Sequence, residues 1–403
     1  MLRFWLIVLA TLAVVMGLSA WSLGAVLPAR WLARGRVAMA ALDALSLLLF
    51  FGLIRWHDGI SESLLRAGVI LFSMYWMAKL VFLVLVGIAS AVRGAYRFFV
   101  ADAPLVPVDM ERRRLLKGAA AFPAAALASG VYGGTAGRTE VALREFSVPV
   151  PGIDDALDGF RVAQLSDIHL GLFFSLEEWR ALLEETAATG ADALAVTGDL
   201  FDDDDMNAEA AQILDAFVPR FPKGIWFCYG NHEHFRNIQA TREALAKTRI
   251  HVLDDASGQV MDGKRPLWFL GVDYPRSRSV FTVDGEKSLE AAMKDVPENA
   301  VKVLLAHHPD FFDSAARRGI ELVLSGHTHG GQLGAFGVPL VPPVFKYMRG
   351  VYHVGRTVGY VHCGNGSWFP YRLGCPPEIA VFALKKTDWD LRMKMLPSKD
   401  EEK

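Results

Sequence analysis

Cysteine, charge and basic surface are all scarce in this chain of 403 residues, and each scarcity excludes a class of protein. Three cysteines are too few for a disulfide-stabilised scaffold. Charged residues make up 21% of the sequence and the net charge is −2, so no basic field for nucleic acid is expected. Hydrophobic residues make up 52%, which excludes a disordered or fibrous chain.

The charges divide the chain into two parts. Residues 1–100 contain nine Lys or Arg and three Asp or Glu, so they carry +6 and the remaining 303 residues carry −8. A prior of about 150 residues per domain allows two or three units. We therefore predict an apolar module at 1–100, a connecting segment at 101–147, a globular domain at 148–390 and a polar tail at 391–403.

Three apolar runs in the N-terminal module are long enough to be transmembrane helices, at about 4–27, 37–54 and 67–92. About 20 apolar residues span a bilayer, and the second and third runs carry one charge each, Asp43 and Lys79. The alternative is a set of buried core helices, but soluble cores rarely use three such runs in succession. Asp43 and Lys79 could pair within the bundle, or each could reach the membrane surface.

Basic residues fall on one side of this predicted membrane module. The loop between the second and third runs has balanced charge, whereas the loop after the first run and the segment after the third are basic. The basic residues concerned are Arg30, Arg34, Arg36, Arg93, Arg97, Arg112, Arg113, Arg114 and Lys117. The positive-inside rule places these segments in the cytoplasm and the globular domain on the opposite side of the membrane.

The segment Arg112–Lys117 resembles a twin-arginine export signal, because two arginines, a spacer, two leucines and a lysine precede the weakly apolar stretch 118–137. Ala126–Ala128 offers a small-x-small cleavage pattern. The alternative is a basic anchor beside the membrane, followed by a weak fourth span. Both interpretations place the following residues outside the cytoplasm, and we favour the one in which the domain stays attached.

The C-terminal part of the chain consists of short apolar runs, each followed by polar residues that can bind metals. The predicted strands are Arg161–Leu165, Ala193–Val196, Ile225–Cys228, Leu267–Leu270, Val301–Leu305 and Leu322–Leu324, and a helix is predicted at Leu176–Ala188. The residues after the strands are Asp167 and His169, Asp199, Asn231 and His232, Asp273, His307, and finally His327 and His329. Ligands bind at the carboxyl ends of strands in open α/β sheets, so we expect these side chains to converge.

The chemistry of this set predicts a pair of metal ions. It contains no thiolate, and mixed imidazole, carboxylate and amide ligands suit Mn, Fe or Zn. Within this set, the seven candidate ligands are Asp167, His169, Asp199, Asn231, His307, His327 and His329. Seven are too many for one ion with open positions, but they fit two ions about 3.5–4 Å apart that share a carboxylate. Such a pair turns a bridging water into a hydroxide nucleophile and holds the oxygens of a phosphoryl group. The predicted reaction is phosphoester hydrolysis.

The ordered motifs resemble those of the calcineurin-like metallophosphoesterases over about Val148–Leu384. They are Asp167-x-His169, Gly198-Asp199, Gly230-Asn231-His232-Glu233, His307 and Gly326-His327-x-His329. The sequences Gly330-Gly331-Gln332 and Arg372-x-Gly374-x-Pro376-Pro377-Glu378 resemble one bacterial branch of exported or membrane-anchored phosphodiesterases, similar to UDP-2,3-diacylglucosamine hydrolase of lipid A synthesis. Members of that branch carry a twin-arginine-like segment before the domain.

The resemblance implies an α/β fold, a two-sheet αββα sandwich, which follows the transmembrane module in this chain. It also implies roles for single residues. One ion would be bound by Asp167, His169 and His329, a second by Asn231, His307 and His327, and Asp199 would bridge the two. His232 would contact the phosphate and protonate the leaving group. The family pattern selects His307 rather than His308.

Weaker candidates surround this set, and each has an alternative interpretation. Asp202 could hold a ligand in place or belong to a solvated acidic loop. His234 could line the pocket or be a surface histidine, and Gln332 could contact a ligand or the substrate. Cys363 and Cys375 could pair in an oxidising compartment.

The predicted function is that of a membrane-anchored phosphodiesterase in the bacterial inner membrane, crossing it several times, with its domain on the periplasmic side. Because a tethered site samples the membrane surface, lipid and lipid-linked phosphoesters are candidate substrates. The alternative is a non-catalytic metal-binding sensor or partner-binding domain on a membrane base. The sequence leaves open the metal identity, the natural substrate, monoester against diester, and the oligomeric state.

Overall fold

The computed structural model describes residues 2–99, 108–275, 281–335, 338–340, 345–367 and 369–387. The chain forms two compact units. The first consists of Met1–Arg138 with Phe369–Tyr371, and the second of Thr139–Trp368 with Arg372–Lys403. The polar tail predicted at 391–403 lies outside the described residues.

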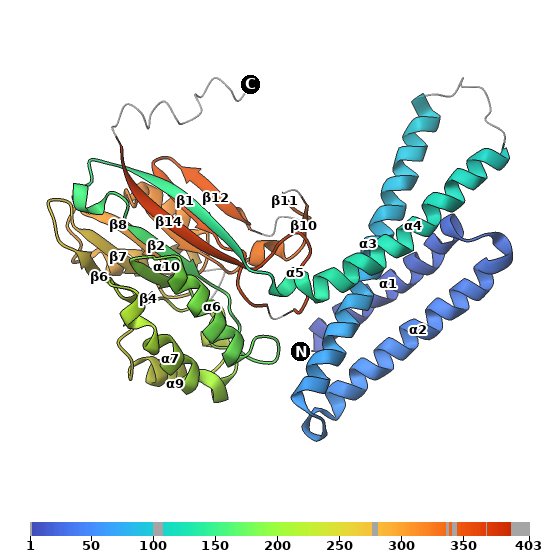
Figure 1. The fold of residues 1–403 in the computed structure, drawn as a ribbon, viewed down its shortest axis with the longest axis horizontal. Helices are drawn as coiled ribbons and strands as arrows, with labels where there is room; N and C mark the ends of the chain where they lie inside the picture. Colours follow the sequence, from blue (N-terminus) through green and yellow to red (C-terminus); the bar gives the residue numbers. More distant parts are fainter. Residues whose placement is uncertain are drawn as a thin grey trace. The chain divides into compact units, whose positions relative to one another are not determined.

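The first unit is helical (Figure 1). Its long helices are α1 (Leu2–Val26), α2 (Ala29–Arg55), α3 (Glu62–Phe99) and α4 (Val108–Gly134), with the short helices η1 (His57–Gly59) and α5 (Ala136–Thr139). Among the described residues, three stretches are long and apolar enough to cross a membrane, namely Val8–Val26, Ala29–Arg55 and Glu62–Tyr96. These apolar helices indicate a membrane protein.

The helices extend further than the apolar runs indicated. We expected Arg30, Arg34 and Arg36 in a loop, but α2 begins at Ala29 and includes all three. Pro28 precedes the first residue of α2, where a proline suits a helix start, and arginine is a good helix former. Hydrophobicity locates the part of a helix that can lie in lipid, whereas backbone hydrogen bonding continues past it.

Helix α4 contains the twin-arginine-like segment Arg112–Lys117 and packs closely on α3. Gly130 of α4 makes this approach possible, because a Cβ atom there would lie 2.8 Å from the carbonyl oxygen of Met74 and 2.9 Å from Cβ of Ala78. Gly134 follows one turn later and faces the side chain of Met74. Small residues four apart let helix backbones approach closely in membrane proteins.

A buried ion pair joins α2 to α3. Asp43 and Lys79 are 2% and 6% exposed, and Lys79 Nζ donates to Asp43 Oδ1 at 2.5 Å. The Tyr75 hydroxyl donates to the same oxygen, and Lys79 Nζ lies 4.9 Å from the ring centre of Trp76. Of the two arrangements that the sequence left open, the structure has the paired one. Each charge is shielded from an apolar environment by the other.

The second unit contains two six-stranded sheets. The order of the first is β1 (Ala142–Pro151), β14 (Glu378–Thr387), β2 (Arg161–Leu165), β3 (Ala193–Val196), β4 (Ile225–Phe227) and β5 (His251–Val252). The order of the second is β12 (Gly350–Val354), β13 (Thr357–Val361), β9 (Leu322–Ser325), β8 (Val301–Leu305), β7 (Leu267–Gly271) and β6 (Ala256–Met261). A two-stranded ribbon pairs β10 (Gly334–Ala335) with β11 (Val338–Pro339).

Parallel pairing brings the polar strand ends together. Strands β2, β3 and β4 run parallel in the first sheet, and β7, β8 and β9 run parallel in the second. The carboxyl ends of each set therefore lie at one edge of their sheet. Strand β14 pairs antiparallel with β2 and parallel with β1, so it lies between these two strands in the first sheet.

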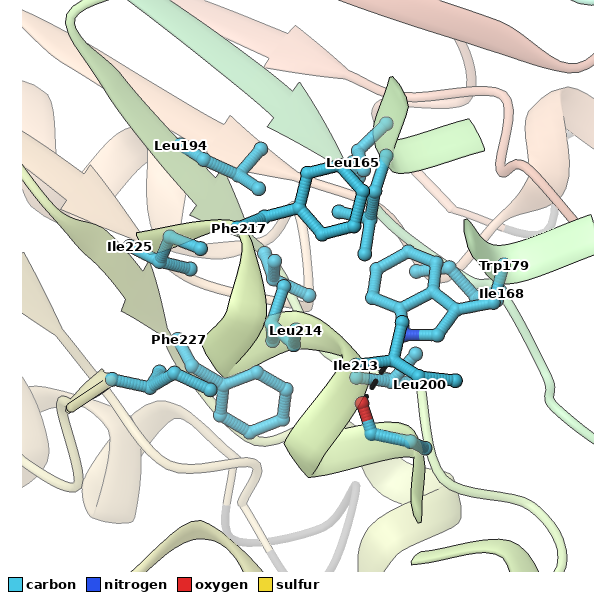
Figure 2. Close-up of a cluster of buried hydrophobic side chains, with 14 of the residues drawn as sticks. Leu165, Ile168, Trp179, Leu194, Leu200, Ile213, Leu214, Phe217, Ile225 and Phe227 are labelled. Carbon is cyan, nitrogen blue, oxygen red and sulfur yellow. Dashed lines mark hydrogen bonds between the residues drawn. The ribbon is translucent and has the colours of Figure 1, made fainter. Parts of the chain in front are cut away.

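Apolar layers on both sides of each sheet fix this arrangement. Trp226, Phe269 and Phe382 belong to the buried cluster between the two sheets. Helices α6 (Leu176–Ala188), α7 (Asn207–Ala216), α8 (Asn231–Phe235) and α9 (Ile238–Leu245) follow strands of the first sheet, and α10 (Phe281–Met293) and α11 (Phe311–Arg317) follow strands of the second. Figure 2 shows the outer layer of the first sheet, where the Trp179 indole N–H donates to the carbonyl oxygen of Ala210.

The predicted α/β sandwich of two sheets flanked by helices is confirmed. Helix α6 begins and ends as predicted, and a capping box of Ser175 and Glu178 explains its start. Strand β4 ends at Phe227, one residue before the predicted end. Strand β1 begins at Ala142 and so includes residues that we expected in the connecting segment at 101–147. Its alternating apolar residues pair with β14, more than 200 residues away in the sequence, and local composition does not show this partner.

Replacement of Asp43 by Asn should destabilise the helical unit by about 3 kcal/mol, because Lys79 would be left buried without a counter-charge. The double variant D43N/K79M should recover most of that loss. Thermal unfolding of the detergent-solubilised chain measures both. Asp58→Asn, at an exposed side chain of η1, is the control and should change little. Equal unfolding temperatures for D43N and the parent chain would show that the pair contributes no stability.

Candidate metal centre

The candidate ligands lie in tight loops immediately after the strands. Five of them, Asp167, His169, Asp199, His327 and His329, have left-handed backbone conformations, with φ between 50° and 71°. Non-glycine residues rarely adopt this region, and Asp, Asn and His are the ones that tolerate it best. The left-handed turns point successive side chains to one place, so a short motif such as Asp167-x-His169 delivers two donors.

The first group of donors consists of Asp167, His169 and His329, all buried. Nε2 of His169 lies 3.0 Å from Nε2 of His329, and Nε2 of His329 lies 3.4 Å from Asp167 Oδ1. Asp167 and His169 follow strand β2, and His329 follows strand β9. Two imidazole nitrogens and a carboxylate oxygen therefore face one another.

The second group consists of Asp199, Asn231, His307 and His327. Asn231 Oδ1 lies 2.7 Å from Nδ1 of His327 and 3.1 Å from Nε2 of His307. Asp199 Oδ2 lies 3.1 Å from the same nitrogen of His307. On its other side that oxygen lies 3.7 Å from Nε2 of His169, so Asp199 faces both groups.

The donor set fits metal ions on its own chemistry. Nδ1 of His307 donates to the carbonyl oxygen of Thr197 at 2.7 Å, so Nε2 is the nitrogen that faces the oxygens of Asn231 and Asp199. Burial by itself would lower the pKa of His307, but the charge of Asp199 outweighs it and raises the pKa to about 10. In the metal-free chain a proton thus balances the carboxylate, and a bound cation would replace that proton.

Two other histidines are held in the neutral form that binds metals. Burial, together with neighbouring imidazoles, keeps the pKa values of His327 and His329 well below the ordinary histidine value. Burial would raise the pKa of Asp199, but the adjacent His307 and His169 hold it well below the usual range. The centre therefore combines neutral imidazoles with an ionised carboxylate, and these are ligand forms that bind Mn, Fe and Zn.

The comparisons with known proteins agree with this geometry. Residues 160–331 match the family model for calcineurin-like phosphoesterases. The chain is 30% identical over 296 residues to the uncharacterized metallophosphoesterase YkuE of Bacillus subtilis (strain 168), covering 69% of this chain and 99% of that protein. This chain belongs to the calcineurin-like metallophosphoesterases. It is accordingly a metal-dependent phosphoester hydrolase.

The chain is also similar to a second named protein and to a solved structure. A Danio rerio protein named transmembrane protein with metallophosphoesterase domain is 29% identical over 254 residues, which cover 60% of this chain and 57% of that protein. Among solved structures, a 5'-nucleotidase precursor from Thermus thermophilus matches 51% of this chain and 49% of its own, at 14% identity and a TM-score of 0.36.

Glu233 anchors the metallophosphoesterase centre, and the sequence motifs gave it no role. Its side chain is fully buried and accepts four backbone N–H groups, from Asp199, Leu200, Phe201 and Gly230, at 2.7–3.1 Å. One carboxylate thus joins the loops after β3 and β4. Burial and the charge of Asp199 raise its pKa. The sequence signal that could have indicated this role is the Glu at the fourth position of the Gly-Asn-His-Glu motif.

Glycine at position 230 is required by the same packing. A Cβ atom there would overlap the carboxylate of Asp199, whose Oδ1 accepts the backbone N–H of His232 at 2.8 Å. The loop after β4 therefore passes directly over the carboxylate that faces both groups. Such a close approach of backbone to a binding group is a common reason for glycine at functional sites.

Asp202 connects His232 to the rest of the centre. Asp202 Oδ1 lies 2.9 Å from Nδ1 of His232 and accepts from Nε of Arg236 at 2.8 Å, while Oδ2 lies 3.4 Å from Nδ1 of His169. Burial opposes ionisation of Asp202, but both histidines outweigh it and lower its pKa. The structure thus places Asp202 behind His232 and His169, and not in a solvated loop.

The remaining candidates lie around the edge. Nε2 of His234 lies 2.6 Å from Asp273 Oδ1, so this histidine pairs with the residue after β7 and not with the two donor groups. Gln332 is buried in a left-handed turn, and its carbonyl oxygen accepts from Leu373 N–H. His308 is also buried, and its ring lies 4.7 Å from that of His327.

Asn365 and residues of the C-terminal motif form the wall behind the first group. Asn365 accepts the backbone N–H of Ser166 and donates to the carbonyl oxygen of Glu378. Arg372 is fully buried and donates to the carbonyl oxygens of Cys363, Gly366 and Cys375. Cys363 and Cys375 are free thiols in the structure. The motif that resembled a bacterial branch therefore has a structural role beside Asp167.

Glu233→Gln should destabilise the metallophosphoesterase unit by about 2–4 kcal/mol, since the amide nitrogen would face two N–H donors that now bond to oxygen. The metal content of the purified chain should fall as well, because the loops that carry Asp199 and Asn231 lose their common anchor. Chemical denaturation and elemental analysis measure the two effects. Glu243→Gln on the exposed face of α9 is the matched control. Unchanged metal content and stability in E233Q would refute the anchoring role.

Proposed function

We propose that this chain is a membrane-anchored phosphodiesterase with two metal ions that share Asp199. The observation that supports it is the position of Asp199 Oδ2, 3.7 Å from His169 and 3.1 Å from His307, between two groups of donors. One ion is assigned to Asp167, His169 and His329, and the other to Asn231, His307 and His327. The absence of thiolate among these donors suits Mn, Fe or Zn ions.

The chain's own residues account for the steps around the phosphate. When bound, the two ions would supply an activated water and neutralise charge on the phosphoryl oxygens. Asn231 and the histidines hold fixed positions for the ligand. His232 contacts the phosphate and gives its proton to the leaving oxygen. Burial opposes the charged form of His232, but its bond to Asp202 and the charge of Asp199 raise its pKa, which favours the protonated acid.

The substrate proposal rests on anchoring. A site tethered to a bilayer meets lipid phosphoesters at a high effective concentration. The C-terminal motif around Arg372 and Glu378 resembles the branch similar to UDP-2,3-diacylglucosamine hydrolase. Lipid and lipid-linked phosphodiesters are therefore the proposed substrates.

The location proposal rests on charge. The basic residues of the first part of α2, together with those at the end of α3 and in Arg112–Lys117, favour a cytoplasmic position for these helix ends. We assign the chain to the bacterial inner membrane, crossing it several times, with the metallophosphoesterase unit on the periplasmic side.

Replacement of His232 by Ala should reduce kcat on a chromogenic phosphodiester by about a hundredfold or more, because the leaving oxygen would lose its proton donor. The metal content should stay at that of the parent chain, since the bond of His232 to Asp199 comes from the backbone N–H and survives the change. Chelation of the parent chain should abolish turnover, and added Mn²⁺ should restore it. Elemental analysis beside steady-state kinetics measures all three.

The control for this variant is His353→Ala, which removes an exposed histidine on β12. It should keep both metal and turnover. A His232→Ala chain that turns over at the parental rate would contradict the acid role, and a chain that works unchanged after exhaustive chelation would contradict the metal-dependent mechanism.

The topology can be tested with single added cysteines, because all three native cysteines are buried. Lys247→Cys, exposed after α9, should react with a membrane-impermeant maleimide in intact spheroplasts. Arg34→Cys, exposed on α2, should react only after permeabilisation. The reverse pattern of labelling would place the metallophosphoesterase unit in the cytoplasm and overturn the proposed orientation.

A further inference from the structure

A cavity of about 550 Å³ opens beside the candidate metal centre, within the metallophosphoesterase unit. Its lining includes His169 and His232. Its volume lies in the range of small-molecule binding sites. The proposed metal ligands other than His169 do not line it, so the cavity extends away from the centre on the side of His232.

The position of His232 decides which part of a substrate this cavity faces. Asp202 holds Nδ1 of His232 at 2.9 Å, so the proton available for transfer is on Nε2. In an in-line displacement the leaving oxygen departs opposite the attacking oxygen, and the acid must lie next to it. The cavity that continues past this acid is therefore on the leaving-group side of the phosphate.

Part of the cavity wall is apolar. Leu172 and Phe173, from the loop after β2, line it together with Phe235 at the end of α8. Phe235 is 71% exposed, more than any other large apolar side chain among the described residues of this unit. Its ring lies 5.5 Å from that of His232. An aromatic ring left in water next to a charged centre marks a surface that an apolar ligand would cover.

Arg236 adds a hydrogen-bond donor to the same wall. Its Nε is bonded to Asp202, and within the described part of the chain its terminal nitrogens have no hydrogen bond to protein. The side chain is 49% exposed and lines the cavity beside Phe235. A guanidinium in this position can donate to an acceptor oxygen on the ligand. The cavity thus combines an apolar surface with one donor close to the acid.

We propose that this cavity binds the leaving group of the substrate, and that the leaving group is an apolar alcohol bearing an acceptor oxygen, as in an acylglycerol. The inference rests on the proposed phosphodiesterase function and specifies which ester bond breaks. The bond between phosphorus and the oxygen of the acylglycerol breaks, the oxygen of water bonds to phosphorus, and the proton of His232 passes to the departing oxygen. The proton that the water loses restores the acid form of His232. The products are the free acylglycerol and a phosphomonoester of the other alcohol.

The test compares two diesters that differ only in the acyl chain, octanoyl-lysophosphatidylglycerol and glycerophosphoglycerol, with the full chain in detergent and Mn²⁺. The ratio of their kcat/KM values should favour the acylated diester by about tenfold. Mass spectrometry should find octanoylglycerol and glycerol phosphate as products. Phe235→Ala should reduce the ratio about fivefold, and Val351→Ala, at an exposed apolar residue of β12, should leave it unchanged.

The outcomes separate this inference from the proposed function. Release of glycerol with retention of lysophosphatidate, a ratio near one, an unchanged ratio in F235A, or faster turnover of a dinucleoside monophosphate would each overturn the leaving-group assignment. Chelator-sensitive hydrolysis of a chromogenic diester would at the same time leave the proposed function intact. Absence of hydrolysis of every diester would refute the proposed function and, with it, this inference.

Discussion

The carboxylate of Glu233 is the constraint on which the geometry of the centre depends. A buried carboxylate is stable only when donors surround it, and here backbone N–H groups from two separate loops fill that need. The loops cannot move apart without leaving those N–H groups and the charge unsatisfied. Asp199 and Asn231, which follow different strands, thereby keep a fixed separation before any ion binds.

The left-handed turns near Glu233 also fix the positions of the ligands. Left-handed backbone at a non-glycine residue costs roughly 1–3 kcal/mol, and five of the proposed ligands adopt it. Hydrogen bonds between loops hold the strain, as where Asp167 N–H donates to the carbonyl oxygen of Gly198 and His169 N–H to that of Asp199. Because the donors are already in place, they bind ions without further ordering. The stability of the two sheets compensates for the unfavourable backbone conformation of these loops.

Both units of the chain contain buried carboxylates, and the groups that stabilise those carboxylates differ. In the helical unit a single carboxylate, Asp43, lies among apolar helices and is neutralised by the ammonium of Lys79 and the hydroxyl of Tyr75. In the other unit Glu233 is satisfied by backbone donors alone, and Asp199 by imidazoles and the backbone N–H of His232. Only the last arrangement leaves donors whose lone pairs face one another, and this is the feature that distinguishes a binding centre from a structural ion pair.

The sequence by itself determined the six strands β2, β3, β4, β7, β8 and β9, the order of the motifs and the class of chemistry. The apolar runs that end in Asp, His and Asn are local patterns, and parallel strands bring such ends to one edge. The pairing of β1 with β14, the anchoring by Glu233, and the cavity next to Phe235 were decided only by the tertiary structure. They depend on contacts between residues tens to hundreds of positions apart, and on backbone conformations that packing imposes against local preference. A one-dimensional pattern carries no record of these distances.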